Sequence, residues 1–336
     1  MRMLVLGGTV FLSRAVAEEA VGRGHDVVCA ARGVSGSVPG GAALVRWDRG
    51  EELPAELAEL RPDAVVDVAR IPSHVRRAVA GFPGAHWTFV STISVYGDVA
   101  TAGGTPDTLP LLDPIEDDLN PAAGSETYGG MKVACENIVR DGTRSAVVLR
   151  PGLVVGPGDP SGRFAYWPAR FAEAAADGRP VIVPEPVDQP VQVIDVRDLA
   201  AWVVDAAEQR LEGVFDAVGP PVPRSELLAQ IAAGTGTMPQ LAPVPAETLT
   251  AHDVAAWSGP RSLPLWIDDP GWSGFLAHDP APAHAAGLRT RPVGETARDT
   301  LRWILETPDA RVTGLTRPEE LELLTEVHPW ASPAAR

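Results

Sequence analysis

Short apolar runs alternate with amphipathic segments through the first half of the chain. Six of these runs predict strands, and they are Met3–Leu6, Asp26–Ala30, Leu44–Trp47, Ala64–Ala69, Trp87–Ser91 and Ala146–Arg150. Between them, segments such as Phe11–Ala20, Ala55–Leu60 and His74–Ala80 have the spacing of helices. Strands that alternate with helices are typical of parallel βαβ units. We therefore expect an α/β fold with a doubly wound parallel sheet, which would bind its ligand at the carboxyl ends of the strands.

The second half begins with the turn-rich stretch Gly156–Gly162 and predicts a smaller region. Predicted helices are Arg163–Ala176, Leu199–Gln209, Ser225–Ala233, Glu295–Leu305 and Thr316–Val327; predicted strands are Val191–Val196 and Gly213–Val218, which would extend the sheet. The stretch Arg261–Phe275 is typical of an ordered loop near a pocket. The expected division is a nucleotide-binding domain over residues 1–155 with about 188–218, and a substrate-binding lid over about 156–187 and 219–336.

Composition places the chain among soluble globular proteins, with 45% hydrophobic and 21% charged residues. The formal charge of −16 disfavours nucleic acid and anionic membranes as partners. Cys29 and Cys135 have no metal-ligand spacing, and we expect both to be buried and no metal to bind. The first residues carry no leader pattern and no apolar run is long enough to cross a bilayer, which favours the cytoplasm. A small-molecule substrate is the expected partner, and the last predicted helix leaves a homodimer open.

A glycine turn follows the first predicted strand. Gly7, Gly8 and Thr9 precede a helix, where a pyrophosphate would rest against the helix N-terminus. The full Gly-x-x-Gly-x-x-Gly pattern is altered, because Val10 and Ser13 occupy its second and third glycine positions. A plain turn between strand and helix, without ligand, is the alternative.

The end of the second strand favours one form of the cofactor. An acidic residue there would bind a ribose 2′-hydroxyl, but Ala31 is followed by Arg32, which suits a 2′-phosphate. We therefore favour NADP(H), with NAD(H) possible, and Asp48 after the third strand is a candidate adenine contact. A solvated surface charge at Arg32 and a loop or cap residue at Asp48 are the alternatives.

The chain contains 27 arginines and one lysine, Lys132, which lies four residues after Tyr128. Residues four apart lie on one face of a helix, so the ammonium could approach the phenol. A nearby positive charge would lower the phenol pKa from its usual ~10 and make Tyr128 an acid/base near neutral pH. Codon bias that left one lysine by accident is the alternative.

Together, these motifs resemble the extended short-chain dehydrogenase/reductase superfamily, whose Rossmann-type members include NAD-dependent epimerases and dehydratases. The matching segments include Gly7–Leu12, Asp63–Ala69, Ser91–Gly97, Tyr128–Lys132, Leu149–Gly158 and Val193–Ala200. The resemblance implies that Tyr128 is the general acid/base, that Lys132 holds the nicotinamide ribose, and that Thr92 hydrogen-bonds the substrate oxygen. It also implies cofactor contacts at Gly7, Gly8, Thr9, Phe11, Leu12, Arg32, Asp48, Ala69, Tyr128, Lys132 and Pro151, and substrate contacts at Ser94, Tyr96 and Trp167.

Departures from the family narrow the reaction. Ile93 and Ser94 follow Thr92 where sugar 4,6-dehydratases carry an Asp-Glu pair, so the elimination chemistry is absent. Val191 stands where nucleotide-sugar epimerases usually carry a phosphate-binding arginine, although Arg163 or Arg170 could compensate.

Three functions follow from the resemblance. The first is an NAD(P)-dependent oxidoreductase acting on a carbonyl or secondary alcohol of a small metabolite. The second is an epimerase that uses the same threonine, tyrosine and lysine, and the third is a redox-inactive sensor or scaffold.

The predicted helix begins with the unfavourable pair Gly129-Gly130, because each glycine in a helix costs roughly 1 kcal/mol relative to alanine. Close approach of substrate, cofactor or a neighbouring helix would offset that cost.

Overall fold

The computed structural model describes residues 1–327, which group into two compact units. The first unit contains Met1–Val154, Val196–Gly219 and His278–Thr290; the second contains Val155–Asp195, Pro220–Ala277 and the residues from Arg291 onward. Residues 188–195 therefore group with the second unit, and 278–290 with the first, unlike the expected division. Residues 328–336, which the expected lid region included, lie outside the described part of the chain.

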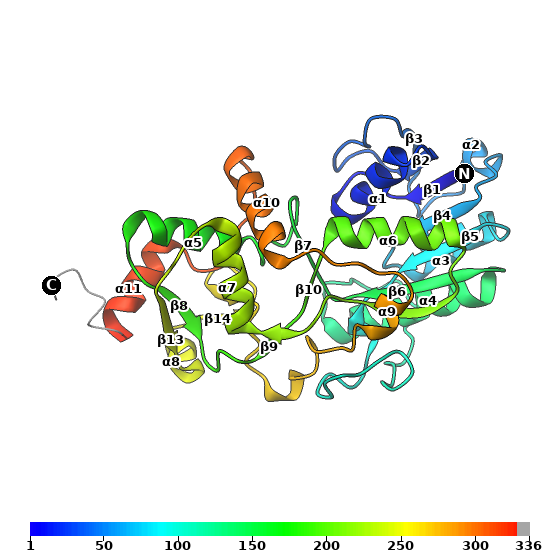
Figure 1. Cartoon of the computed structure of the whole chain (residues 1–336). Coiled ribbons are helices and arrows are strands. Elements are labelled where there is room, and N and C mark those ends of the chain that lie inside the picture. Colours follow the sequence, from blue (N-terminus) through cyan, green and yellow to red (C-terminus); the bar gives the residue numbers. More distant parts are fainter. Residues whose placement is uncertain (328–336) are drawn as a thin grey trace. The chain divides into compact units, whose positions relative to one another are not determined.

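The first unit is built on a seven-stranded parallel sheet of order β11-β6-β5-β4-β1-β2-β3 (Figure 1). Its strands are β1 (Arg2–Leu6), β2 (Asp26–Ala31), β3 (Ala43–Arg46), β4 (Ala64–Asp67), β5 (His86–Val90), β6 (Ala146–Pro151) and β11 (Gly213–Ala217). The predicted doubly wound Rossmann-type sheet is confirmed: β2 and β3 extend it on one side of β1, and β4 begins its extension on the other side. A crevice at the carboxyl ends of the strands is expected where a sheet extends in both directions in this way.

Helices flank this sheet. They are α1 (Phe11–Gly22), α2 (Ala55–Ala58), α3 (Pro72–Gly81), α4 (Ser125–Gly142), α6 (Val196–Gln209) and α9 (Ala281–Ala285), with the 3₁₀ turn η1 (Ile93–Val95). Helix α1 packs against α6, and α3 packs against α4. Alternate side chains of β1 point to opposite faces, and both Met3 and Leu4 are fully buried. Both faces of the sheet are therefore covered, as parallel sheets require.

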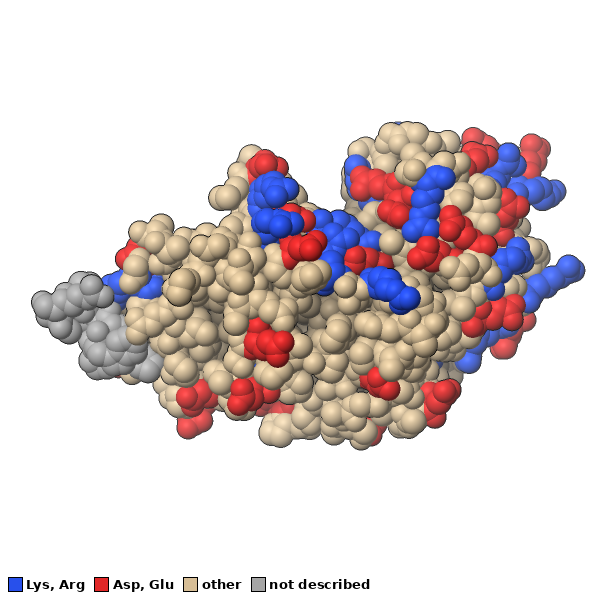
Figure 2. All heavy atoms as spheres, viewed as in Figure 1, with Lys and Arg blue, Asp and Glu red and all other residues tan. Residues whose placement is uncertain are grey.

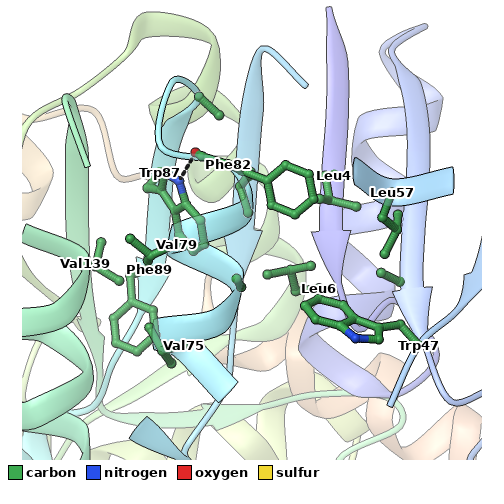
Figure 3. Close-up of a cluster of buried hydrophobic side chains, with 14 of the residues drawn as sticks. Leu4, Leu6, Trp47, Leu57, Val75, Val79, Phe82, Trp87, Phe89 and Val139 are labelled. Carbon is green, nitrogen blue, oxygen red and sulfur yellow. Dashed lines mark hydrogen bonds between the residues drawn. The ribbon is translucent and has the colours of Figure 1, made fainter. Parts of the chain in front are cut away.

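One face carries the core cluster drawn in Figure 3. Leu4 and Leu6 of β1 meet Val75 and Val79 of α3, and Val139 of α4 joins the same cluster. Four buried aromatic rings belong to the cluster, and they are Trp47, Phe82, Trp87 and Phe89. The indole nitrogen of Trp87 donates to the carbonyl of Phe82 at 3.0 Å, so this buried polar atom is satisfied. The cluster fixes the strands whose carboxyl ends form the site described below.

The second unit is made of small paired strands and helices. Its strands are β8 (Val181–Pro184), β9 (Pro190–Val191), β10 (Val193–Asp195), β12 (Val222–Pro223), β13 (Leu241–Val244), β14 (Ala255–Trp257) and β15 (Ser262–Pro264). Its helices are α5 (Tyr166–Asp177), α7 (Arg224–Thr235), α8 (Ala246–Ala251), α10 (Val293–Glu306) and α11 (Arg317–Val327), with the 3₁₀ turn η2 (Pro270–Trp272). Strand β7 (Leu153–Val155) lies where the chain leaves the first unit.

The prediction that Val191–Val196 extends the main sheet is wrong. The structure divides this segment into β9 and β10, and neither belongs to the seven-stranded sheet. Strand β9 instead pairs antiparallel with β12. The predicted extension by Gly213–Val218 is confirmed, because β11 pairs with β6. The apolar patterns of the two segments are alike, and only the pairing partner separates them.

Charged groups are interspersed over α1 and α6 (Figure 2). Arg23 at the end of α1 donates to Asp205 at 2.5 Å and to Glu208 at 3.1 Å, both on α6. It also bonds Glu19 within its own helix. This face therefore mixes acidic and basic side chains despite the net charge of −16. None of the helices within residues 1–327 is both long and apolar enough to cross a membrane.

Candidate active site

A cleft of about 460 Å³ lies at the carboxyl ends of β1 to β4. Its walls come from the segments that follow these strands, and they include Gly7, Thr9, Arg32, Asp48, Ala69 and Arg70. Five predicted cofactor residues, all but Arg70, are thus brought together in one place. This is the edge at which a doubly wound sheet binds its ligand.

The glycine turn fits a phosphate group in spite of the altered pattern. Gly7 and Gly8 have φ angles of +132° and +90°, which favour glycine. A Cβ at Gly8 would lie 2.4 Å from the sulfur of Cys29, so the turn passes directly over β2. Val10 precedes α1 without a side-chain cap, and the first turn of α1 has no acidic residue. The N–H groups of that turn are available to an anion.

Phe11, Leu12 and Gly8 do not line the cleft. Phe11 and Leu12 begin α1 and are half-buried, and Gly8 is buried. Phe11 has a φ of +40°, unusual for a residue other than glycine, as the chain turns into the helix. The cofactor contacts predicted for these three residues stay predictions, and they would have to be made by backbone groups.

Arg32 and Asp48 stand on the same wall of the cleft. Arg32 is exposed, and its guanidinium has no hydrogen-bond or ion-pair partner within residues 1–327. One carboxylate oxygen of Asp48 accepts from the N–H of Gly50 at 2.9 Å, which is the cap role considered as its alternative. Arg32 is thus a cation on the lining of the cleft without an acidic partner among residues 1–327.

Lys132 joins the ends of two neighbouring strands. Its ammonium donates to the carbonyl of Ala69 at 2.8 Å and to that of Val90 at 2.6 Å. It also lies 4.2 Å from the centre of the Phe89 ring. Burial lowers the lysine pKa to about 8. An arginine fork is larger and planar, so the compact ammonium explains why lysine stands here.

Thr92 and Tyr128 form the polar centre of the site. Thr92 precedes η1, where its hydroxyl accepts from the N–H of Ser94 at 3.1 Å and donates to the Ser94 hydroxyl at 3.2 Å. Tyr128 lies in the first turns of α4 and is half-buried. Burial raises the pKa of its phenol, and a hydrogen bond with Thr92 and the charge of Arg70 oppose that rise. The hydroxyl groups of Thr92 and Tyr128 are therefore close to each other.

The expected effect of Lys132 on Tyr128 differs from what the structure contains. The sequence predicted that the lysine charge would lower the phenol pKa, yet burial raises it, and the cation that opposes the rise is Arg70. The ammonium of Lys132 is taken up by the two backbone carbonyls. Helical spacing places Tyr128 and Lys132 on one face of α4, but it does not determine which acceptor groups the ammonium binds.

Arg70 is a site residue that the sequence reasoning missed. It lines the cleft, is exposed, and has no hydrogen-bond or ion-pair partner in the described chain. Its charge lowers the pKa of both Tyr128 and Lys132. Its position directly after the strand that ends in Asp67-Val-Ala was the available signal, because parallel strands place such residues at the ligand edge.

A buried ion pair supports the same strand end. Both carboxylate oxygens of Asp67 accept from Arg49, at 2.9 and 2.8 Å, and one of them also accepts from the N–H of Ala69. Arg49 further donates to the carbonyl of His74. Asp67 is completely buried, so this bidentate pair leaves its charge compensated. The arrangement holds the Ala69 carbonyl where Lys132 reaches it.

Gly129 and Gly130 allow chain segments, rather than a ligand or a helix, to approach α4. A Cβ at Gly129 would lie 2.0 Å from the carbonyl oxygen of Ser94. One at Gly130 would lie 2.8 Å from the side chain of Ile115 and 2.9 Å from the carbonyl of Asp113. Gly129 therefore lets the Ser94 backbone lie against the helix that carries Tyr128, and Gly130 admits the chain at Asp113 and Ile115.

Two predicted substrate contacts lie in the interior. Tyr96 is 2% exposed, and its hydroxyl donates to Asp216 at 2.6 Å and accepts from Arg150 at 2.9 Å. Trp167 is fully buried in the second unit, and its indole donates to the carbonyl of Pro264 at 3.1 Å. Their polar atoms are satisfied by the protein, so we do not retain them as substrate contacts.

The remaining predicted positions border the site. Ser94 is half-buried and bonded to Thr92, so it stays a candidate. Pro151 ends β6 and is buried next to Ala217 of β11. Cys29 and Cys135 are buried and free, as predicted, and burial raises their thiol pKa values to about 11 and about 12.

Comparison with known families supports the motif reading. Residues 78–216 match the profile described as the NAD dependent epimerase/dehydratase family. This part of the chain is similar to the NAD-dependent epimerase/dehydratase family. The matched range contains Thr92, Tyr128 and Lys132. A comparison with curated proteins found no match.

Several solved structures share the fold of this chain. A putative epimerase from Burkholderia cenocepacia is 21% identical with a TM-score of 0.64, covering 90% of this chain and 97% of its own. The Bordetella bronchiseptica enzyme WbmH in complex with NAD⁺ is 18% identical with a TM-score of 0.61, covering 91% and 99%. Thermus thermophilus UDP-glucose 4-epimerase in complex with NAD is 22% identical with a TM-score of 0.59, covering 91% and 100%. At these identities the likeness establishes the fold.

Proposed function

We propose that this protein is an NAD(P)-dependent oxidoreductase that acts on a carbonyl or secondary alcohol of a small metabolite. The proximity of the Thr92 hydroxyl to the Tyr128 phenol carries the proposal. It stands beside a lysine that bridges two strand ends, and the cofactor cleft is formed by the same sheet edge. The family supports the same chemistry, because its members are NAD-dependent.

The bound dinucleotide would supply or accept the hydride. Tyr128 would give a proton to the substrate oxygen during reduction, or remove it during oxidation. Thr92 would donate a hydrogen bond to the same oxygen and stabilise the negative charge that develops there. Lys132 keeps the two strand ends in register, and the charge of Arg70 opposes the rise in the phenol pKa that burial causes. A phenol that remains protonated at neutral pH suits the reducing direction.

The cleft residues would hold the adenosine half of the cofactor. The uncapped first turn of α1 would bind a phosphate, and Arg32 would bind a 2′-phosphate. NADP(H) is therefore our proposed cofactor. Structures of similar fold contain NAD, so NAD(H) is the competing form.

Epimerisation is the second candidate function. It is favoured by the family match and by the UDP-glucose 4-epimerase of similar fold. The same threonine and tyrosine would serve, because epimerisation by transient oxidation needs one oxidation and one reduction at the same carbon. Against nucleotide sugars, Val191 is fully buried where a phosphate-binding arginine would stand.

The proposed activity can be tested on the purified protein without knowing its natural substrate. Native mass spectrometry would identify a retained dinucleotide, and NADPH oxidation would be followed with a panel of aldehydes and ketones. We expect Tyr128→Phe to lower kcat by roughly 10²–10⁴-fold while the Kd for NADPH stays within about twofold, because only the proton donor is lost.

The two candidates give different results. Free exchange with NADPH in solution supports the oxidoreductase, whereas tightly retained cofactor and interconversion of UDP-glucose epimers support the epimerase. Wild-type turnover by Tyr128→Phe would remove the tyrosine from the mechanism. A wild-type protein that binds neither NADPH nor NADH would overturn the proposal as a whole.

A further inference from the structure

Arg163 of the second unit carries a guanidinium whose terminal nitrogens have no hydrogen-bond or ion-pair partner among residues 1–327. The side chain lies over the indole of Trp257, with 4.6 Å between the guanidinium carbon and the ring centre. Its Nε donates to the hydroxyl of Ser161 at 3.3 Å. The two terminal nitrogens make neither a hydrogen bond nor an ion pair with residues 1–327. The fork is thus fixed at its base and open at its end.

The nearest acidic residue does not neutralise this cation. Asp159 is buried, and its two carboxylate oxygens accept from the N–H and the hydroxyl of Ser161, both at 2.8 Å. Burial raises the pKa of Asp159 and lowers that of Arg163, although each charge opposes the shift of the other. A partly desolvated cation without a directly bonded counter-ion is an unfavourable arrangement that an anionic ligand would relieve.

An aromatic wall stands beside Arg163. The ring centres of Trp257 and Phe275 are 6.2 Å apart, and those of Phe275 and Trp272 are 5.2 Å apart. All three rings are half-buried. Trp257 also has a φ of +71°, a left-handed conformation that is strained for a bulky residue. This strained residue is the one whose ring supports the guanidinium.

The other arginine considered from the sequence has a structural role. Arg170 is 4% exposed and forms ion pairs with Glu173 at 2.9 Å and Glu320 at 3.2 Å. These two glutamates already compensate the charge of Arg170. Of the two arginines that could replace the missing charge at Val191, Arg163 is therefore the one able to bind a ligand.

We infer that Arg163, held on Trp257, binds an anionic group of the substrate, a carboxylate or a phosphoryl group, while Phe275 and Trp272 contact an adjacent planar or apolar part. The fork geometry of arginine suits both groups, which can accept two parallel hydrogen bonds. Half-buried aromatic faces suit a ring or hydrocarbon next to the anion. The inference deepens the proposed function, on which it rests for the identity of the ligand as substrate.

Isothermal titration with three probes tests the site on the full chain. Phenyl phosphate and benzoate each carry an anion on an aromatic ring, and benzyl alcohol is the neutral counterpart. We expect the wild type to bind at least one anion and to bind benzyl alcohol at least tenfold more weakly. Arg163→Ala should weaken the anion about tenfold or more, because the charge-assisted bonds are lost. The tighter of the two anions identifies the phosphoryl or the carboxylate form.

Matched variants separate the site from general charge effects. Arg302→Ala removes one positive charge from the exposed face of α10 in the same unit and should leave anion binding unchanged. Trp257→Leu should weaken binding as Arg163→Ala does, and Arg163→Lys, which keeps the charge but loses the fork, should give an intermediate result. Equal anion binding by Arg163→Ala and the wild type, or no anion binding by the wild type, overturns the inference.

A parallel NADPH titration separates the two proposals. Arg163→Ala should bind NADPH with the wild-type Kd, because the cofactor cleft is lined by residues of the first unit. If the wild type binds the anionic probe but no dinucleotide, the proposed function fails while the anion site stands. If the dinucleotide binds and Arg163→Ala leaves the probe unaffected, the anion site fails alone.

Discussion

The ammonium of Lys132 is bonded to backbone, which changes how the residue should be understood. By donating to the carbonyls of Ala69 and Val90, it ties the ends of β4 and β5 together at the ligand edge. Its charge is fully buried, so it also carries a desolvation cost that appears as a pKa near 8. The effect of the lysine's hydrogen bonds on stability can be separated from the effect of its buried charge, because only the charge of the side chain depends on pH.

Lys132→Met should change the pH dependence of stability. In the folded protein the lysine pKa is about 8, against the ordinary 10.5, so between these values the unfolded chain holds a proton that the folded one lacks. The free energy of unfolding of the wild type should therefore rise relative to the variant from pH 8 to pH 10.5, by on the order of 2–3 kcal/mol. Urea unfolding at several pH values measures this difference.

The variant is also expected to be less stable throughout, since two carbonyls lose their donor at a cost of about 1–3 kcal/mol each. The pH slope is the decisive observation, because lost hydrogen bonds alone would give a constant difference. A difference that stays flat from pH 8 to pH 10.5 would mean that the buried ammonium has an ordinary pKa.

Arg32 determines the cofactor preference in our proposal. It is exposed, unpaired in the described chain and lines the cleft, so a carboxylate in its place would repel a 2′-phosphate and accept the 2′-hydroxyl of NAD(H). Arg32→Asp should raise the Kd for NADPH at least tenfold and lower that for NADH. Arg46, a neighbouring exposed arginine on β3 that is not among the cleft residues, provides the control as Arg46→Asp. Unchanged NADPH affinity in Arg32→Asp would show that the cation is only a surface charge.

At the scale of elements, α4 and the chain at Thr92–Ser94 form one functional piece. The absence of a side chain at Gly129 lets the Ser94 carbonyl lie against the helix, and that contact places Thr92 beside Tyr128. Helix propensity alone would favour almost any other residue over glycine at this position. Its presence is explained by close approach, since a Cβ would lie only 2.0 Å from an oxygen of the backbone.

Gly129→Ala should therefore destabilise the protein despite its better helix propensity. Backbone must move to admit the methyl group, and we expect a loss of about 1–3 kcal/mol, comparable to overpacking a core, together with reduced kcat. Gly22→Ala at the end of α1 is the control, because nothing lies within 4 Å of its Cβ position. That change should be neutral or stabilise by up to about 1 kcal/mol. Thermal unfolding of both variants gives the comparison, and equal shifts would contradict the packing argument.

Local patterns predicted the elements of the first unit well, because strand and helix periodicities are properties of short segments. Strands such as Met3–Leu6 and the order of the site motifs are confirmed by the sheet. The failures depend on distant partners. Tyr96 was taken for a substrate contact because its acceptor, Asp216, lies 120 residues further along the chain. Arg70 was missed because its effect on Tyr128 depends on how separate strands are ordered in the sheet.

At the scale of the whole molecule, each compact unit is assembled from separate stretches of chain. The first unit takes its last piece, His278–Thr290, from beyond most of the second unit. A buried polar chain joins that piece to the sheet: His278 bonds Asp216 at 3.0 Å, Asp216 bonds Tyr96, and Arg150 links Tyr96 to Glu136. Hydrogen bonds between buried polar side chains thus connect segments of the first unit that lie far apart in the sequence.

His278→Ala should loosen the first unit while leaving the second unit intact. The variant removes a hydrogen bond to the buried carboxylate of Asp216 and a ring contact with Tyr96 at 5.3 Å, at a cost of about 1–3 kcal/mol. Hydrogen exchange should show lower protection in β6 and β11, with β8 and β13 unchanged. His252→Ala, which removes a half-exposed ion pair with Glu326 in the second unit, should cost less than about 1 kcal/mol. If β8 and β13 lose as much protection as β11, the polar chain is not specific to the first unit.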